Sequence, residues 1–129
     1  MNTQQRRALI SSGTPSARAA EERLRAHYEF VPLEEAELVI ALGGDGFMLQ
    51  TLHHMLETDS IAPVFGINLG TVGFLMNEWR LERLDQRIEA AKPFKVNPLR
   101  MQVKTVGGET VALPAINEVS LLRETRQTA

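Results

Sequence analysis

Five apolar residues follow one another from Leu38 to Leu42. A continuous apolar run of this length is typical of a parallel strand that is buried on both faces. After a short glycine-rich stretch, apolar side chains recur at the spacing of one helical face, at Met48, Leu52, Met55 and Leu56. The pattern therefore predicts a buried strand, a tight turn, and a helix that runs to about Glu57.

Apolar runs and apolar residues at helical spacing also predict the elements on either side of this strand, turn and helix. Thr14 and Pro15 are typical of an N-cap and a first helical position, and apolar residues at helical spacing continue this helix to residue 28. A further helix is expected over residues 81–91, ended by Pro93. Strands are expected at residues 7–11, 30–32 and 64–68. Because strands and helices alternate, the expected fold class is α/β, a Rossmann-like open parallel sheet with flanking helices.

Beyond Pro93 the hydrophobic pattern changes from helical to alternating. Apolar and polar residues alternate over 99–104, Gly107-Gly108 predicts a hairpin turn, and residues 115–122 are expected to be a strand that contains the polar pair Asn117-Glu118. We therefore expect an α/β domain over residues 1–93 and the first strands of a β-rich domain over 94–129. The apolar faces of these strands are expected to need a partner sheet, which favours self-association. They include Val119 and Leu121.

The turn after the central strand has the sequence Gly43-Gly44-Asp45-Gly46. Glycine can adopt positive φ and lets the backbone approach a ligand closely, and N–H groups beside a helix N-terminus favour an anion. We therefore expect Gly43, Gly44 and Gly46 to bind phosphate. A carboxylate repels phosphate, so Asp45 is expected to accept a proton from a hydroxyl group or to meet phosphate through a metal ion. This combination indicates phosphoryl transfer to an alcohol, and the alternative is a plain turn with Asp45 as an N-cap.

Two other segments carry candidate binding residues. The glycine-bearing loop at residues 69–75 follows the strand at 64–68, so it lies at the same edge of the expected sheet. It is either a packed turn or the opposite wall of the same crevice, where Phe74 offers a flat apolar surface to a base or ribose. The pair Asn117-Glu118 is either a turn or strand-edge pair or a second set of polar ligand contacts.

Composition narrows the classes of function. The net charge of −2 gives no electrostatic reason to expect nucleic acid or an anionic membrane as a partner. The absence of cysteine excludes disulfides and thiolate chemistry. His53 and His54 point in different directions around their helix without a third ligand at useful spacing, so no metal ligand is assigned. No apolar run is long enough to span a bilayer and no signal-type segment follows the N-terminus, so a cytoplasmic location is expected.

Three landmarks occur in order along the chain: the turn at 43–46, the sequence Asn-Leu-Gly-Thr-Val-Gly-Phe-Leu at 68–75, and Asn117-Glu118. Together they resemble the NAD kinase family, the ATP or polyphosphate NAD kinases, over nearly the whole chain. The first landmark is also found in phosphofructokinases and in diacylglycerol and sphingosine kinases. A lipid kinase or another phosphotransferase of this superfamily is therefore the alternative. A non-catalytic nucleotide-binding module is a third hypothesis, against which Asp45 argues, because a phosphate-binding loop has no use for a carboxylate.

The resemblance implies an enzyme that phosphorylates the 2′-hydroxyl of the adenosine ribose of NAD to give NADP, with ATP or polyphosphate as the donor. It implies that Asp45 is the catalytic proton acceptor, that Gly46 lies beside that ribose, and that Phe74 lines the NAD crevice. Asn117 and Glu118 would bind the adenosine end of NAD. The implied cofactor is a divalent metal ion, magnesium with ATP, and the implied assembly is a homo-oligomer.

In this family a second, β-rich domain follows the Asn-Glu strand and completes the NAD site. Residues 94–129 are therefore expected to be the truncated start of that NAD-binding domain. The chain by itself is expected to fold in part and to be inactive, because one wall of the crevice cannot position NAD against a phosphate donor.

Overall fold

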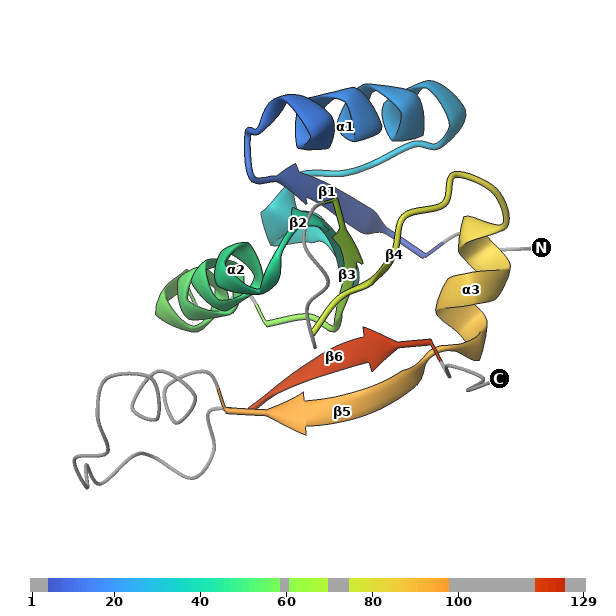
Figure 1. Ribbon diagram of the computed structural model, residues 1–129. Coiled ribbons are helices and arrows are strands. Elements are labelled where there is room, and N and C mark those ends of the chain that lie inside the picture. Colours follow the sequence, from blue (N-terminus) through green and yellow to red (C-terminus); the bar gives the residue numbers. More distant parts are fainter. Residues whose placement is uncertain (1–4, 59–60, 70–74, 98–117, 125–129) are drawn as a thin grey trace, which may run out of the picture.

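The computed structural model describes residues 5–58, 61–69, 75–97 and 118–124. Within these residues, one six-stranded sheet has the order β1-β2-β3-β6-β5, and β4 also pairs with β3 (Figure 1). Every pairing is parallel except that of β5 with β6. The strands are β1 (Arg7–Ser11), β2 (Leu38–Gly43), β3 (Val64–Asn68), β4 (Asn77–Glu78), β5 (Lys92–Val96) and β6 (Val119–Arg123). A mostly parallel sheet of this kind confirms the predicted α/β fold.

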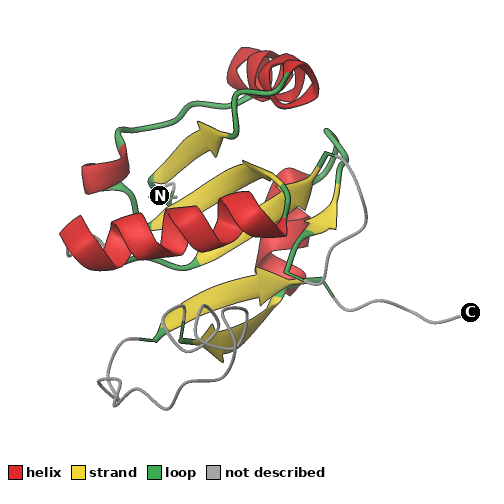
Figure 2. Cartoon of the chain, turned by 60° about the vertical axis from the view of Figure 1, so that its left-hand side comes forward, coloured by secondary structure: helices red, strands yellow, loops and turns green. Residues whose placement is uncertain are grey.

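The helices cover the two faces of the sheet and form two apolar cores. Alternate residues of a strand point to opposite faces, so neighbouring β2 residues such as Val39 and Ile40 lie in different cores. The helix α2 (Asp45–Thr58) packs on one face, and α1 (Pro15–His27) and α3 (Leu84–Ala90) pack on the other (Figures 1 and 2). All six residues of β2 are buried, as expected for a central strand covered on both sides.

Most of the predicted elements lie where the hydrophobic pattern placed them. The strands at 7–11 and 64–68 are confirmed, α1 begins after the Thr14 cap, and α2 ends one residue beyond the expected Glu57. The edge strand at residues 30–32 was wrong, because only the Val31 amide bonds to β1, at Arg7 O, and Pro32 has no N–H. A short 3₁₀ helix (Leu33–Glu35) follows instead.

The helix before Pro93 is shorter than predicted, since α3 begins at Leu84 and Leu81 lies in the preceding loop. Pro93 itself lies in β5, an edge strand, where a missing N–H is tolerated. The predicted hairpin turn at Gly107-Gly108 and the alternation over 99–104 lie outside the described residues.

The strand β6 corrects two expectations about the C-terminal segment. Its described part begins at Val119, so Glu118 precedes the strand instead of lying inside it. Val119 and Leu121 are each 1% exposed and belong to the core under α2, so they do not await a partner sheet. The sheet therefore continues across residue 93, and the division into domains at 1–93 and 94–129 stays a prediction.

Candidate functional site

The candidate site lies at the carboxyl edge of the sheet, where β2 ends at Gly43 and β3 ends at Asn68. These two residues are register partners, and the Leu69 amide donates to the Gly43 carbonyl at 3.1 Å. Gly44 links β2 directly to α2, and its carbonyl accepts the Met48 amide at 2.9 Å. The strand, turn and helix are thus as tightly connected as the sequence predicted.

Asp45 is the first residue of α2 and is partly buried. Its Oδ1 accepts a hydrogen bond from the Leu75 amide at 3.1 Å. The carboxylate therefore connects the first turn of α2 to Leu75, 30 positions further along the chain. This bond across the carboxyl edge goes beyond the plain N-cap alternative, because an N-cap side chain bonds within its own helix.

The turn has glycines because of the space that they leave, and not because its backbone adopts an unusual conformation. Among the described glycines, positive φ occurs only at Gly13, so Gly43, Gly44 and Gly46 do not use the positive φ that glycine allows. A Cβ built on Gly43 would lie 2.9 Å from the Phe47 ring, which explains glycine there by packing. A Cβ on Gly44 or Gly46 would meet nothing within 4 Å. These two positions leave the backbone open to an incoming ligand on either side of Asp45.

The structure places only some of the other predicted site residues. Phe74 and Asn117 lie outside the described residues. Glu118 is exposed and immediately precedes β6. Because β6 runs parallel to β3, Glu118 lies toward the amino end of these strands, whereas Asp45 lies at their carboxyl edge. Glu118 therefore does not join Asp45 in the described part of the chain.

Sequence reasoning missed a buried polar network beside the site. Asn77 is only 4% exposed, and its side chain bonds to three backbone groups at the junction of β3, β4 and β6. Arg87, 8% exposed, forms a bidentate ion pair with Glu124 and donates to the Glu78 carbonyl at 2.6 Å. An Asn directly after the apolar pair Leu75-Met76 was the available signal, but the sequence shows neither its burial nor which backbone groups it meets.

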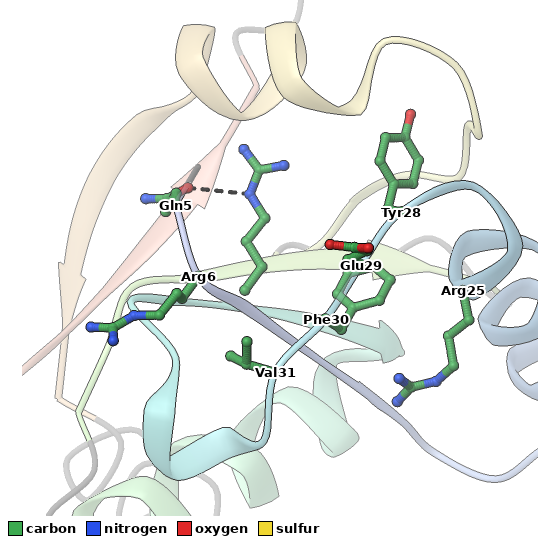
Figure 3. Close-up of a pocket in the computed structure, with 8 residues that line it drawn as sticks. Gln5, Arg6, Arg25, Tyr28, Glu29, Phe30 and Val31 are labelled. Atoms are coloured by element: carbon green, nitrogen blue, oxygen red, sulfur yellow. Dashed lines mark hydrogen bonds between the residues drawn. The ribbon is translucent and has the colours of Figure 1, made fainter. Parts of the chain in front are cut away.

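A pocket of about 550 Å³ lies at the opposite, amino edge of the sheet. Figure 3 shows its lining, which comes from the residues before and at the start of β1, from the last turn of α1 and from the segment that follows it. The lining includes Arg6, Arg25, Tyr28 and Phe30. We call it the amino-edge pocket. A smaller pocket of about 430 Å³ lies between α1 and the end of β3 and is lined partly by Asn68, Leu69 and Trp79. The smaller pocket, not the larger one, borders the carboxyl edge.

No group of three or more His, Cys, Asp or Glu side chains in the described part of the chain is placed to hold a metal ion. None of the helices within the described ranges has the length and hydrophobicity that a membrane crossing requires.

Comparisons with known proteins found a matching family model and several curated relatives. Residues 2–91 match the family model described as ATP-NAD kinase N-terminal domain. Curated relatives named NAD kinase are 60% identical over 127 residues in Rhizorhabdus wittichii, 62% over 124 in Zymomonas mobilis, and 50% over 122 in Mesorhizobium japonicum. These matches cover 98%, 96% and 95% of the chain but 49%, 48% and 47% of the relatives. The chain thus spans about half the length of the curated relatives it matches.

Proposed function

Because this chain belongs to the ATP-NAD kinase N-terminal domain family, we propose that it supplies the catalytic half of an NAD kinase. The reaction transfers the terminal phosphoryl group of ATP or polyphosphate to the 2′-hydroxyl of the adenosine ribose of NAD, giving NADP. Relatives named NAD kinase align with nearly the whole chain, which supports this substrate class.

The observation that carries the proposal is the placement of Asp45. It lies at the carboxyl edge of a parallel sheet, where open α/β folds bind ligands, between two glycines whose Cβ positions are open. A carboxylate can accept about four hydrogen bonds, so the Leu75 contact is compatible with a bond from a substrate hydroxyl.

In the proposed reaction the 2′-oxygen of NAD attacks the terminal phosphorus of the donor. An oxygen–phosphorus bond forms there, the bond from that phosphorus to the leaving ADP or shortened polyphosphate breaks, and Asp45 takes the hydroxyl proton. The turn amides near Gly44 and Gly46 lie beside the N-terminus of α2, where the helix dipole favours phosphate. Correct positioning of both substrates supplies much of the catalysis in phosphoryl transfer.

The remaining roles are assigned from the resemblance. Gly46 lies beside the ribose, Phe74 lines the NAD crevice, and Asn117 and Glu118 bind the adenosine end of NAD. Because Glu118 lies toward the amino end of β6, away from Asp45 of the same chain, this contact of Glu118 would be made to NAD held at Asp45 of a second copy. Magnesium is commonly held by one or two carboxylates together with substrate phosphates and water. Asp45 with a bound triphosphate fits that pattern, and the ion would supply neutralisation of phosphate charge. We further propose a homo-oligomeric, cytoplasmic enzyme.

The alternative, a diacylglycerol or sphingosine kinase, shares only the turn at 43–46 with the motifs found here. Nothing in the relatives favours it, since those reported above are all named NAD kinase. The two functions differ in their acceptor, a ribose hydroxyl or a lipid hydroxyl. Direct comparison of acceptors therefore separates them.

The test is an NADP-formation assay on two proteins: the chain alone, and the chain fused to the C-terminal half of the Rhizorhabdus wittichii relative. We expect the fusion to form NADP from NAD with ATP or polyphosphate and the chain alone to form none above background. Diacylglycerol and sphingosine serve as competing acceptors. A fusion with native circular dichroism that phosphorylates a lipid but not NAD would overturn the proposal.

A further inference from the structure

We propose that Asn77 is a positioning residue for the candidate active site. Its amide joins three strands where the sheet forks and thereby fixes the backbone that holds Asp45. This inference rests on the proposed function where it concerns turnover, but its structural part can be measured without any substrate.

The fork lies along one edge of β3. The first half of this strand pairs with β6, through Val64 and Phe65, and the last half pairs with β4, through Ile67 and Asn68. Gly66 lies between the two pairings, at the point where one neighbouring strand replaces the other. A parallel sheet that changes partner in this way leaves backbone groups at the junction that need other hydrogen bonds.

The Asn77 side chain supplies those bonds. Its Nδ2 donates to the Gly66 and Leu122 carbonyls, each at 2.9 Å, and its Oδ1 accepts the Glu124 amide at 2.8 Å. The orientation of the amide is fixed by chemistry, since two carbonyls must face the NH₂ group and an N–H must face the oxygen. A leucine of similar size at position 77 would fill the space but leave all three backbone groups unpaired, which is costly at a buried site.

The fork is mechanically connected to Asp45 through a very short segment. Leu75, whose amide binds Asp45, is separated from Asn77 only by Met76, which is 1% exposed. Residues 75–77 are therefore tied to α2 at one end and to β3 and β6 at the other. Arg87 reinforces the second tie, because it binds both the Glu124 carboxylate and the Glu78 carbonyl. Loss of the Asn77 bonds should let the Leu75 amide move relative to Asp45.

The first experiment uses the 129-residue chain alone and measures amide hydrogen exchange by NMR. We expect Asn77→Leu to accelerate exchange of the Leu75 amide on the order of tenfold more than that of the β1 amides. Tyr28→Phe is the matched control, since it also removes one side-chain bond to a carbonyl, that of Leu81 at 3.2 Å, away from the fork. The control is expected to leave Leu75 exchange unchanged. Equal exchange of Leu75 in wild type and the folded Asn77→Leu variant would overturn the proposal.

The second experiment measures NADP formation by the fusion protein described above. We expect Asn77→Leu to lower kcat at least tenfold with the KM for ATP within about twofold, because misplaced catalytic groups cost rate more than binding. Tyr28→Phe should leave both constants within about twofold. If Asn77→Leu does not fold, Asn77→Ser, which keeps one donor and one acceptor, takes its place with a smaller loss of kcat. Unchanged kcat in the folded variant would contradict positioning, whereas a wild-type fusion without activity would contradict only the proposed function.

Discussion

The two edges of the sheet contrast in how their polar groups are used. At the amino edge, the pocket has the larger volume, and its three arginines are ion-paired with Glu37, Asp85 and Glu21. At the carboxyl edge, the Asp45 carboxylate accepts a hydrogen bond from the Leu75 amide. The glycines on either side of Asp45 leave open space around it. Under the proposed function, the larger pocket is not the site, because its arginines already have partners. Open backbone beside the Asp45 carboxylate is then the better indication of where a ligand binds.

The largest expected effect tests the carboxyl edge directly. In the fusion protein, Asp45→Asn should lower kcat by roughly 10²–10⁴-fold, because the amide cannot accept the hydroxyl proton. NAD binding and the circular dichroism spectrum should change little, since asparagine has nearly the same shape. Steady-state NADP formation and NAD titration measure the two quantities. A variant with wild-type kcat would remove Asp45 from the role of base.

A second prediction concerns the polar pair that precedes β6. Asn117→Ala and Glu118→Ala in the fusion protein should each weaken NAD binding by about 1–3 kcal/mol if a partner group on the ligand is left buried. Binding of the phosphate donor should change much less, because the pair is assigned to the adenosine end of NAD. Isothermal titration with each ligand separately measures this difference. If both variants keep the wild-type Kd for NAD, the nucleotide binds elsewhere.

A pair of glycine substitutions distinguishes packing from ligand space. A Cβ at Gly66 would clash with the ends of Met48 and Met76, both of which are buried, so Gly66→Ala should cost about 1–3 kcal/mol of stability. Gly44→Ala meets no atom within 4 Å and should change the unfolding free energy by less than about 1 kcal/mol. Urea unfolding of the chain measures both. The fusion carrying Gly44→Ala should nevertheless lose activity, and full activity would mean that the space above Gly44 is not used.

The smallest effect is expected at the amino edge. Arg25 pairs with Glu21 at 3.0 Å and donates to the Leu9 carbonyl at 3.2 Å, but its side chain is about half exposed. Arg25→Gln should therefore cost no more than about 1 kcal/mol of stability, since exposed ion pairs contribute little. NADP formation by the fusion should stay within about twofold of wild type. A loss comparable with that of Asp45→Asn would reverse the comparison between the two edges.

Hydrophobic periodicity was sufficient for the units that are local in sequence. The continuous apolar run Leu38–Leu42 forms a strand that is buried along its whole length, as its pattern predicted, and the glycine turn follows it directly. The position of Asp45 at the carboxyl edge could thus be predicted from adjacent residues alone. Its bond to Leu75 could not, because that contact depends on how a distant loop returns to the sheet.

The errors share this dependence on distant partners. Val119 and Leu121 looked like an exposed face because the alternating pattern does not reveal that β6 inserts between β3 and β5. Asn77 drew no prediction, because its three partners are up to 47 positions away. Phe30 and Val31 have the composition of a strand, yet only one backbone bond forms there. Periodicity reports how one element is covered, but not which element covers it.

The insertion of β6 also has a consequence for biosynthesis. Strands β1, β2 and β3 are made first and can pair as they leave the ribosome, but the outer edge of β3 stays open toward its β6 partner until Val119–Arg123 is translated. Strand β5, which pairs with β6 on its other side, waits for the same segment. Non-local parallel pairing is slow, and unpaired edges recruit other chains. Nascent chains of this protein should therefore depend most on chaperones in the interval between synthesis of β3 and synthesis of β6.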